Sequence, residues 1–304
     1  MGLAMGNANV YMLVTITAFF WGANFLLGGY VLHDATPFWA AALRFMLGAA
    51  LMLAFAAARQ ERLMEPLRRH AATYLMLGVV GIVAFNLFFF EALRFTSANN
   101  AALIMATNPL LTALLAAALL GERPGMRYLF ALPIALAGVA IVITHGALSS
   151  LFALHFSIGD MLMLGADLFW ALYNVLTRRF MPPGAPLVHT AWIMAAGATV
   201  LLAVALASQG HLAPLGIKAS VSLAVMAVGG TVLAYLFWSM GIAQLGAARA
   251  AIFLNLVPVF AMLLGALIDA APTTAQLFGG LLVLGSVSVT VLPGWRPVDA
   301  RLAR

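Results

Sequence analysis

The sequence contains no cysteine, and only 8% of its 304 residues are charged. Without cysteine, the chain cannot form disulfides, use a thiol nucleophile or hold a soft metal through thiolates. With 64% hydrophobic residues and so few charges, it has too little polar surface to cover a water-soluble globule. The composition therefore predicts an integral membrane protein, with the lipid bilayer as its main partner.

Motifs for catalytic or cofactor chemistry are also missing. The sequence has no P-loop, no Gly-rich dinucleotide turn, no serine nucleophile elbow and no pair of catalytic carboxylates. The six histidines show no helical ligand spacing. We therefore expect no enzyme, no cofactor and no metal site, and the chain alone cannot hydrolyse ATP. We attribute the net charge of +6 to membrane topology, so no nucleic-acid partner is expected.

Ten apolar runs occupy most of the chain, and each is about as long as the roughly 20 residues needed to cross a bilayer. The runs are continuous and do not alternate with polar residues, which favours helices over the strands of an outer-membrane barrel. The fold is predicted to be all-α, a polytopic membrane protein with ten transmembrane helices. The runs cover residues 11–30, 37–58, 71–94, 97–120, 126–144, 157–179, 186–208, 218–243, 247–268 and 274–293.

Basic residues are distributed unevenly between the connecting loops. If the N-terminus is cytoplasmic, twelve of the fifteen basic residues lie in inner segments, and only Arg94 and Lys218 lie in outer ones. The remaining cation, Arg44, lies within the second run. Because cytoplasmic loops of membrane proteins are enriched in Lys and Arg, both termini are predicted to be cytoplasmic.

The second half of the chain repeats the first at a constant offset of 149 residues. Pairs at this offset include Trp21 and Trp170, Pro37 and Pro186, and Pro109 and Pro258. Each half, placed at 1–148 and 149–304, holds five spans, so the second half must enter the membrane from the opposite side. Such inverted repeats are typical of secondary transporters, whose substrate site lies between the two halves near the midplane.

Pro109 and Pro258 interrupt the fourth and ninth runs at equivalent positions. A proline inside a helix removes a backbone hydrogen bond and bends the helix. Proline is common in membrane helices, so either residue alone carries little weight. As a symmetric pair, they are predicted to act as hinges beside a cavity.

Two long stretches resemble a known family. "EALRFTSANNAALIMATNPLLTALLAAALLGERP" begins at Glu91, and its echo "GIAQLGAARAAIFLNLVPVFAMLLGALIDAAP" begins at Gly241. Together with "FFWGANFLLGGYVL" near the start, they are similar to the ten-helix EamA-type branch of the drug/metabolite transporter superfamily. The resemblance implies a carrier of the bacterial inner membrane that exports amino acids or other small metabolites. Within that branch, the sequence is similar to the aromatic amino acid exporters.

Asp167 lies near the middle of the sixth run, with Trp170 and Asn174 on the same helical face. An ionisable residue inside the membrane is costly and therefore a functional candidate. Three interpretations stay open: Asp167 binds a substrate ammonium group, carries a coupled proton, or is a structural acid.

Arg44 and Glu91 are predicted to lie at similar heights on the second and third runs. The simpler interpretation is an ion pair that ties the two helices together. In the alternative, the Arg44 guanidinium binds the carboxylate of a departing amino acid, and the pair belongs to a gate.

Trp21 and Trp170 lie mid-span at equivalent repeat positions, with Asn24 and Tyr173 three residues further on. These faces are predicted to form the wall of a midplane cavity that stacks on a substrate side chain. Interhelical packing is the alternative for each residue. Weaker substrate-binding candidates on the facing spans are Asn86, Asn108, Tyr235, Trp238 and Asn255.

These features predict a secondary transporter that works by alternating access, and the resemblance implies that it exports small amphipathic metabolites, in particular amino acids including aromatic ones. A carrier of nucleobases, sugars or drug-like cations is the alternative. A membrane-embedded enzyme acting on lipid, or a channel, is more remote, because the cytoplasmic loops offer mainly arginine and paired helix breaks favour a carrier. Ten spans suffice for a complete pathway, so a monomer is expected.

Overall fold

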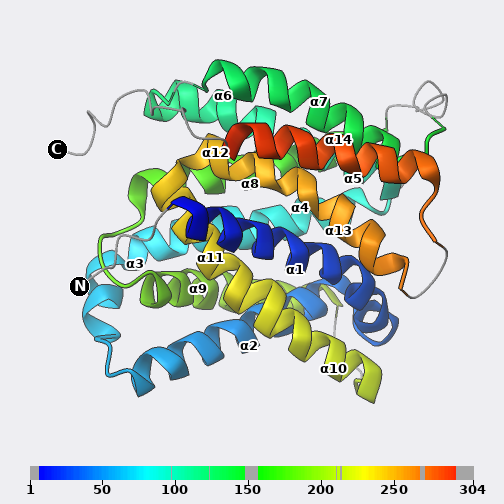
Figure 1. Cartoon of the computed structure of the whole chain (residues 1–304). Helices are drawn as coiled ribbons and strands as arrows, with labels where there is room; N and C mark the ends of the chain where they lie inside the picture. The colour runs from blue at the N-terminus through cyan, green and yellow to red at the C-terminus, as the bar shows by residue number, and fades with distance from the viewer. Residues whose placement is uncertain are drawn as a thin grey trace.

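The computed structural model describes residues 7–96, 98–122, 124–147, 157–209, 211–212, 214–267 and 271–291. Within these ranges the chain is helical and contains no strand, which confirms the all-α prediction. The predicted boundary between the two halves, at residues 148 and 149, lies outside the described residues. Figure 1 shows the helices packed as one bundle, with α6, α7 and α14 on one side and α2, α9 and α10 on the other.

The first half forms five spans, of which three are single helices and two are composite. Its elements are α1 (Asn7–Asp34), α2 (Pro37–Ala58), α3 (Met64–Gly78), the π-helix η1 (Val79–Ala84), α4 (Phe85–Ala92), α5 (Ala98–Met105), α6 (Asn108–Leu120) and α7 (Met126–Ile143). The third span begins at Met64, earlier than the predicted residue 71, because a polar turn precedes the apolar run. His70, with φ −125° and ψ 17°, marks the kink between that turn and the membrane helix.

The second half repeats this arrangement. Its elements are α8 (Ile158–Phe180), α9 (Pro186–Gln209), α10 (Ile217–Val225), the π-helix η3 (Met226–Leu233), α11 (Ala234–Leu245), α12 (Ala247–Ala251), the 3₁₀-helix η4 (Ile252–Asn255), α13 (Leu256–Gly265) and α14 (Thr274–Val291). Among the described residues, nine helical segments are long and apolar enough to cross a membrane. The one remaining predicted span is α8, the sixth in chain order. It has 23 residues but carries two aspartates and two arginines, which lower its hydropathy.

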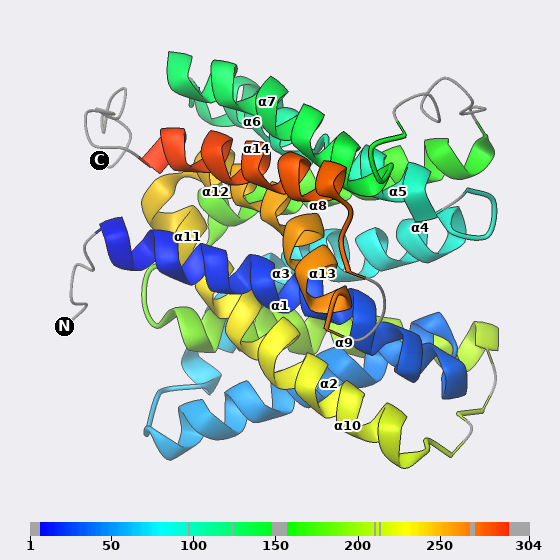
Figure 2. The ribbon, with the colours of Figure 1, turned by 45° about the vertical axis from the view of Figure 1, so that its right-hand side comes forward.

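Helix pairing follows an inverted two-fold symmetry. The contact of α1 with α11 is matched by that of α8 with α4, and the contact of α1 with α13 is matched by that of α8 with α6. The symmetry axis runs through the pairs α2 with α9 and α7 with α14, which join equivalent spans of the two halves. Figure 2 shows α7 and α14 side by side. The first helix of each half therefore packs against helices of the other half.

Glycines at close helix crossings reproduce this symmetry residue by residue. A Cβ added at Gly48 would lie 2.8 Å from Thr231 Cγ2, and one added at Gly197 would lie 2.8 Å from Ile82 Cβ. Gly48 and Gly197 differ by 149 positions, as do Ile82 and Thr231. The offset read from the sequence therefore matches the three-dimensional repeat.

The two spans that carry the repeat-related prolines Pro109 and Pro258 are both broken, as predicted. In the fourth span, α5 ends at Met105, four residues before Pro109, and α6 begins at Asn108. In the ninth span, a 3₁₀-helix reaches Asn255 before α13 begins, and Pro258 lies in the first turn of α13. Proline cannot donate to the carbonyl four residues earlier, so the α-helix ends or tightens at that carbonyl. That these breaks act as hinges stays a prediction.

Candidate functional site

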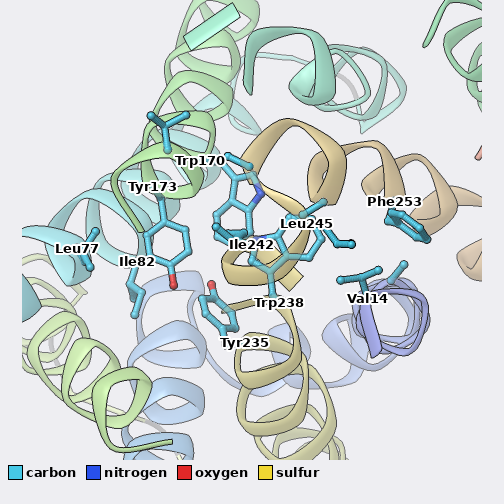
Figure 3. Packing of buried hydrophobic residues seen from close by; sticks show 14 of the residues in the cluster. Val14, Leu77, Ile82, Trp170, Tyr173, Tyr235, Trp238, Ile242, Leu245 and Phe253 are labelled. Atoms are coloured by element: carbon cyan, nitrogen blue, oxygen red, sulfur yellow. The ribbon is translucent and has the colours of Figure 1, made fainter. Parts of the chain in front are cut away.

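Five aromatic side chains from both halves meet inside the bundle, and we call them the aromatic cluster: Trp21 on α1, Trp170 and Tyr173 on α8, and Tyr235 and Trp238 on α11. The Trp21 ring lies 5.3 Å from Trp170 and 5.1 Å from Trp238, measured between centroids. Tyr235 lies 5.8 Å from both Trp21 and Trp170. Figure 3 shows Trp170, Tyr173, Tyr235 and Trp238 converging between their helices. The structure thus brings the repeat-related Trp21 and Trp170 into contact; that they bind substrate stays a prediction.

Four of the five rings in the aromatic cluster are buried, and Trp21 is partly exposed. Trp238 and Tyr173 are 0% exposed, Tyr235 is 4% exposed and Trp170 is 5% exposed. The expected open cavity wall is therefore not seen, because the rings fill the space between the halves. A separate groove of about 440 Å³ shares no residue with the cluster. It is lined by Tyr11, Met12, Thr15, Phe253, Leu256, Leu284, Val287, Ser288 and Val291.

The π-helical segments supply close contacts to the site. Trp21 Nε1 donates to the carbonyl of Gly230 in η3 at 3.0 Å. Asn24, half-buried one turn further on, lies directly against the Cα of Gly230. The equivalent contact has the halves exchanged: the ring of Tyr173, in the second half, lies against Gly81 in η1 of the first half. A π-helix turn and a glycine together let these side chains approach the backbone closely.

Asp167 has no exposed surface, and its carboxylate is held by the first half of the chain. Asn108 Nδ2 donates to Asp167 Oδ1 at 2.7 Å and to the Asp167 backbone carbonyl at 3.0 Å. Thr107 Oγ1 lies 3.1 Å from Asp167 Oδ2. These donors belong to the break in the fourth span, so the costliest charge in the membrane is satisfied exactly where that helix is interrupted.

A hydrogen-bonded chain connects Asp167 with the aromatic cluster. Thr112 Oγ1 donates to Asn108 Oδ1 at 3.0 Å, and Asn174 Nδ2 lies 3.4 Å from Thr112 Oγ1. Trp238 Nε1 then donates to Asn174 Oδ1 at 2.9 Å. Asn108, Asn174 and Trp238 were singled out from the sequence as substrate-site candidates, a role that stays a prediction, whereas Thr112 was not singled out. Its position one turn after Asn108 was the available signal.

The expected ion pair between Arg44 and Glu91 is not formed. Glu91 instead pairs with Arg94 three residues later, at 2.9 Å. The Arg44 Nε is buried without a hydrogen-bond partner, and the guanidinium lies 4.7 Å from the Phe45 ring centroid. Similar height along the membrane does not fix the direction in which a helix presents a side chain, so the sequence prediction of this pair was wrong.

The remaining candidates lie in different surroundings. Asn86 Nδ2 donates to the Ile82 carbonyl of its own span at 2.6 Å, a local role. Asn255 is buried at the end of η4, and both its amide atoms lack a partner. Among the described residues, no group of three or more acidic or histidine side chains is arranged to hold a metal ion.

Comparison with known proteins identifies the chain's relatives. The model of the EamA-like transporter family matches residues 8–144 and again 157–292. The uncharacterized transporter YyaM of Bacillus subtilis (strain 168) is 36% identical over 284 residues, which are 92% of each chain. A probable amino-acid metabolite efflux pump of Escherichia coli (strain K12) is 28% identical, over 92% of this chain and 94% of the pump.

A solved crystal structure shares the fold. It aligns with a TM-score of 0.80 and 22% identity, covering 92% of this chain and 96% of that one. At this identity the likeness concerns the arrangement of helices alone. The double match of the family model agrees with the two halves related by the offset of 149 residues.

Proposed function

Because the chain belongs to the EamA-like transporter family, and is therefore a membrane transporter and not an enzyme, we propose that it is a secondary carrier that exports amino acids, including aromatic ones. In this proposal it acts in the bacterial inner membrane as a monomer, with both termini in the cytoplasm. The substrate binds at the aromatic cluster, and each side of the membrane gains access in turn.

The observation that carries this proposal is the position of Arg44 beside the aromatic cluster. Its guanidinium covers Phe45, and the Phe45 ring lies 5.5 Å from Tyr235, a member of the cluster. A buried guanidinium nitrogen without a partner is a ready donor for an anion. A carboxylate site next to a large aromatic surface fits an amino acid with a large apolar or aromatic side chain.

Two further observations support the proposal. A relative that aligns over most of both chains is named a probable amino-acid metabolite efflux pump. The residues of the aromatic cluster come from α1 of one half and from α8 and α11 of the other. A relative movement of the halves would therefore separate the rings and open the site.

Nucleobases, sugars and drug-like cations are the competing substrates. A cation is disfavoured by the Arg44 guanidinium at the edge of the cluster, since like charges repel. A nucleobase or a sugar gains stacking on the rings but leaves the guanidinium without a carboxylate partner.

Counterflow in proteoliposomes tests the proposal. Liposomes preloaded with unlabelled amino acid are given labelled phenylalanine, threonine or methionine outside, because only a carrier accelerates labelled uptake under these conditions. We expect exchange, fastest for phenylalanine. Trp170→Ala should abolish it, whereas Phe130→Ala, which removes a lipid-facing ring that is 67% exposed, should leave it unchanged.

Arg44 provides a second test with the same assay. Arg44→Met should weaken phenylalanine exchange about tenfold or more, the scale of one hydrogen bond to a charged group. Phenethylamine, which keeps the ring but lacks the carboxylate, should not exchange. Folded wild-type protein without any amino acid exchange would exclude this substrate class. Exchange undiminished in Trp170→Ala would retain the carrier and exclude the aromatic cluster as its site.

A further inference from the structure

The hydrogen bonds between the aromatic cluster and Asp167 all run in one direction. Trp238 donates to Asn174, Asn174 to Thr112, Thr112 to Asn108, and Asn108 to the Asp167 carboxylate. A tryptophan N–H can only donate, which fixes the direction at one end. At the other end, an ionised carboxylate can only accept. The chain therefore delivers a donor to Asp167 Oδ1, which can accept it whether or not Oδ2 carries a proton, so a proton on Oδ2 acts through Thr107.

Thr107 has two acceptors for a single hydroxyl hydrogen. Its Oγ1 lies 2.7 Å from the carbonyl of Ile104 and 3.1 Å from Asp167 Oδ2. Ile104 belongs to α5, the part of the fourth span before the break, and Thr107 directly precedes α6. The hydroxyl has a single hydrogen, so at any moment it donates a full hydrogen bond either to the carboxylate or to the α5 backbone carbonyl.

We propose that Asp167 is the proton-coupling site of this carrier and that Thr107 is the positioning residue that transmits its protonation to the broken fourth span. This inference rests on the proposed transport function. When Asp167 is ionised, Thr107 donates to Oδ2. When a proton binds Oδ2, the new O–H donates to Thr107 Oγ1, and the threonine hydrogen turns to the Ile104 carbonyl.

The switch changes the hydrogen bonding of the helix break while keeping every group satisfied. The proton comes from water on one side of the membrane and returns to water on the other side, so no further reactant is needed. Asp167 has no exposed surface here, and its proton therefore exchanges only in another conformation. A carrier that returns from outside to inside with a proton, and from inside to outside with substrate, is an antiporter driven by the inward proton gradient.

The groups that surround Asp167 leave it as the titrating residue of this region. Its carboxylate accepts from the neutral side chains of Thr107 and Asn108. On the same helix, Tyr173 lies in the aromatic cluster, Asp160 occupies the first turn, and Arg178 and Arg179 occupy the last. The packed elements α5, α6 and η1 contain no titratable residue. The titratable or charged residues of the other elements packed on α8 are Glu65, Arg68, Arg69, His70 and Tyr74 on α3, Glu91 on α4, Tyr235 on α11 and Arg249 on α12.

Asp167→Asn tests the coupling, because asparagine has the size of aspartate and cannot take up a proton. Two measurements are made on the same proteoliposomes: phenylalanine counterflow at equal pH, and phenylalanine accumulation driven by an acidic interior with the membrane potential clamped. For wild type, one-for-one exchange predicts accumulation of up to about tenfold per pH unit. For Asp167→Asn, we expect gradient-driven accumulation to be lost while counterflow at equal pH remains measurable.

Thr107 variants separate positioning from structure. Thr107→Ser keeps the hydroxyl and should retain gradient-driven accumulation within about twofold. Thr107→Val keeps the shape without the hydroxyl and should lower that accumulation about fivefold or more, with counterflow at equal pH within twofold. The smaller pH response with intact exchange is a readout that a purely structural role would not move.

The outcomes distinguish this inference from the proposed function. Wild-type protein that exchanges phenylalanine but ignores the pH gradient would overturn the inference and leave the carrier in place. An Asp167→Asn protein that still accumulates substrate would also overturn it. Should Asp167→Asn fail to fold, equal gradient responses of Thr107→Ser and Thr107→Val would overturn the inference. Wild-type protein without exchange would remove the proposed function, and this inference with it.

Discussion

Gly81 and Gly230 are the clearest single positions at which the fold depends on the absence of a side chain. They are equivalent in the two repeats, and each lies in a π-helical segment against a side chain of the opposite half. Their contact residues, Tyr173 and Asn24, are also equivalent. A Tyr173 ring that is 0% exposed has no room to retreat from a new methyl group.

Gly81→Ala is therefore expected to destabilise the protein by about 1–3 kcal/mol, the usual cost of overpacking a filled interior. The measurement is thermal unfolding of the purified variant in detergent. Gly285→Ala is the matched control, because that glycine is also helical and a Cβ there would have nothing within 4 Å. An unchanged melting temperature for Gly81→Ala would mean that the Tyr173 ring can move, and the cluster would be less tightly packed than its burial indicates.

Individual side chains divide into those that sequence can place and those that it cannot. Helical spacing placed Asp167 and Asn174 on one face, and both belong to the chain of hydrogen bonds. Arg44 and Glu91 were matched by height alone, but pairing also requires the correct rotation of both helices. Arg94, one turn from Glu91, takes its carboxylate instead, because partners within one helix need no tertiary placement.

The composite spans show how the two halves use irregular helices. The third and eighth spans contain π-helical segments at equivalent places, and the fourth and ninth are broken just before a proline. The breaks at Pro109 and Pro258 were predicted from their pairing across the repeat, since a single proline need not break a helix: Pro133 lies inside the continuous α7. The π-helices were not, since no residue type forces the extra residue in a turn and tertiary packing decides it.

Pro109→Ala tests whether the proline sustains the break in the fourth span. Alanine restores an N–H that can bond the Met105 carbonyl and join α5 to α6. One net hydrogen bond, about 0.5–1.5 kcal/mol, shifts a conformational equilibrium by up to about tenfold. We therefore expect initial counterflow rates to fall about tenfold in protein that remains folded by size-exclusion chromatography.

Pro133→Ala is the matched control for this experiment. Pro133 lies inside α7 on an exposed face, away from both breaks, so its replacement should leave the transport rate unchanged. If Pro109→Ala also transports at the wild-type rate, the break is sustained by the contacts of Thr107 and Asn108 with Asp167 and not by the proline.

The arrangement of the two halves could be predicted from the sequence, but the close packing of the aromatic cluster between them could not. Five spans per half and a constant offset were enough to predict an inverted pair, and the contacts of Gly48 and Gly197 agree with that offset. Periodicity and composition do not distinguish a packed aromatic cluster from an open cavity, because the same rings line both. The tightness of the cluster is set by tertiary contacts between the halves, which a residue pattern does not encode.

Orientation in the membrane is testable for the whole chain, because the protein has no cysteine of its own. Single cysteines introduced at Glu61 and at Ala147, both exposed in loops at opposite ends of spans, act as reporters. The excess of basic residues in one set of loops predicts that Glu61 faces the cytoplasm. In intact cells, a membrane-impermeant maleimide should label Ala147→Cys and leave Glu61→Cys unlabelled, whereas permeabilised cells should show both. The reverse pattern would place both termini outside the cell and would contradict the topology predicted from the basic residues.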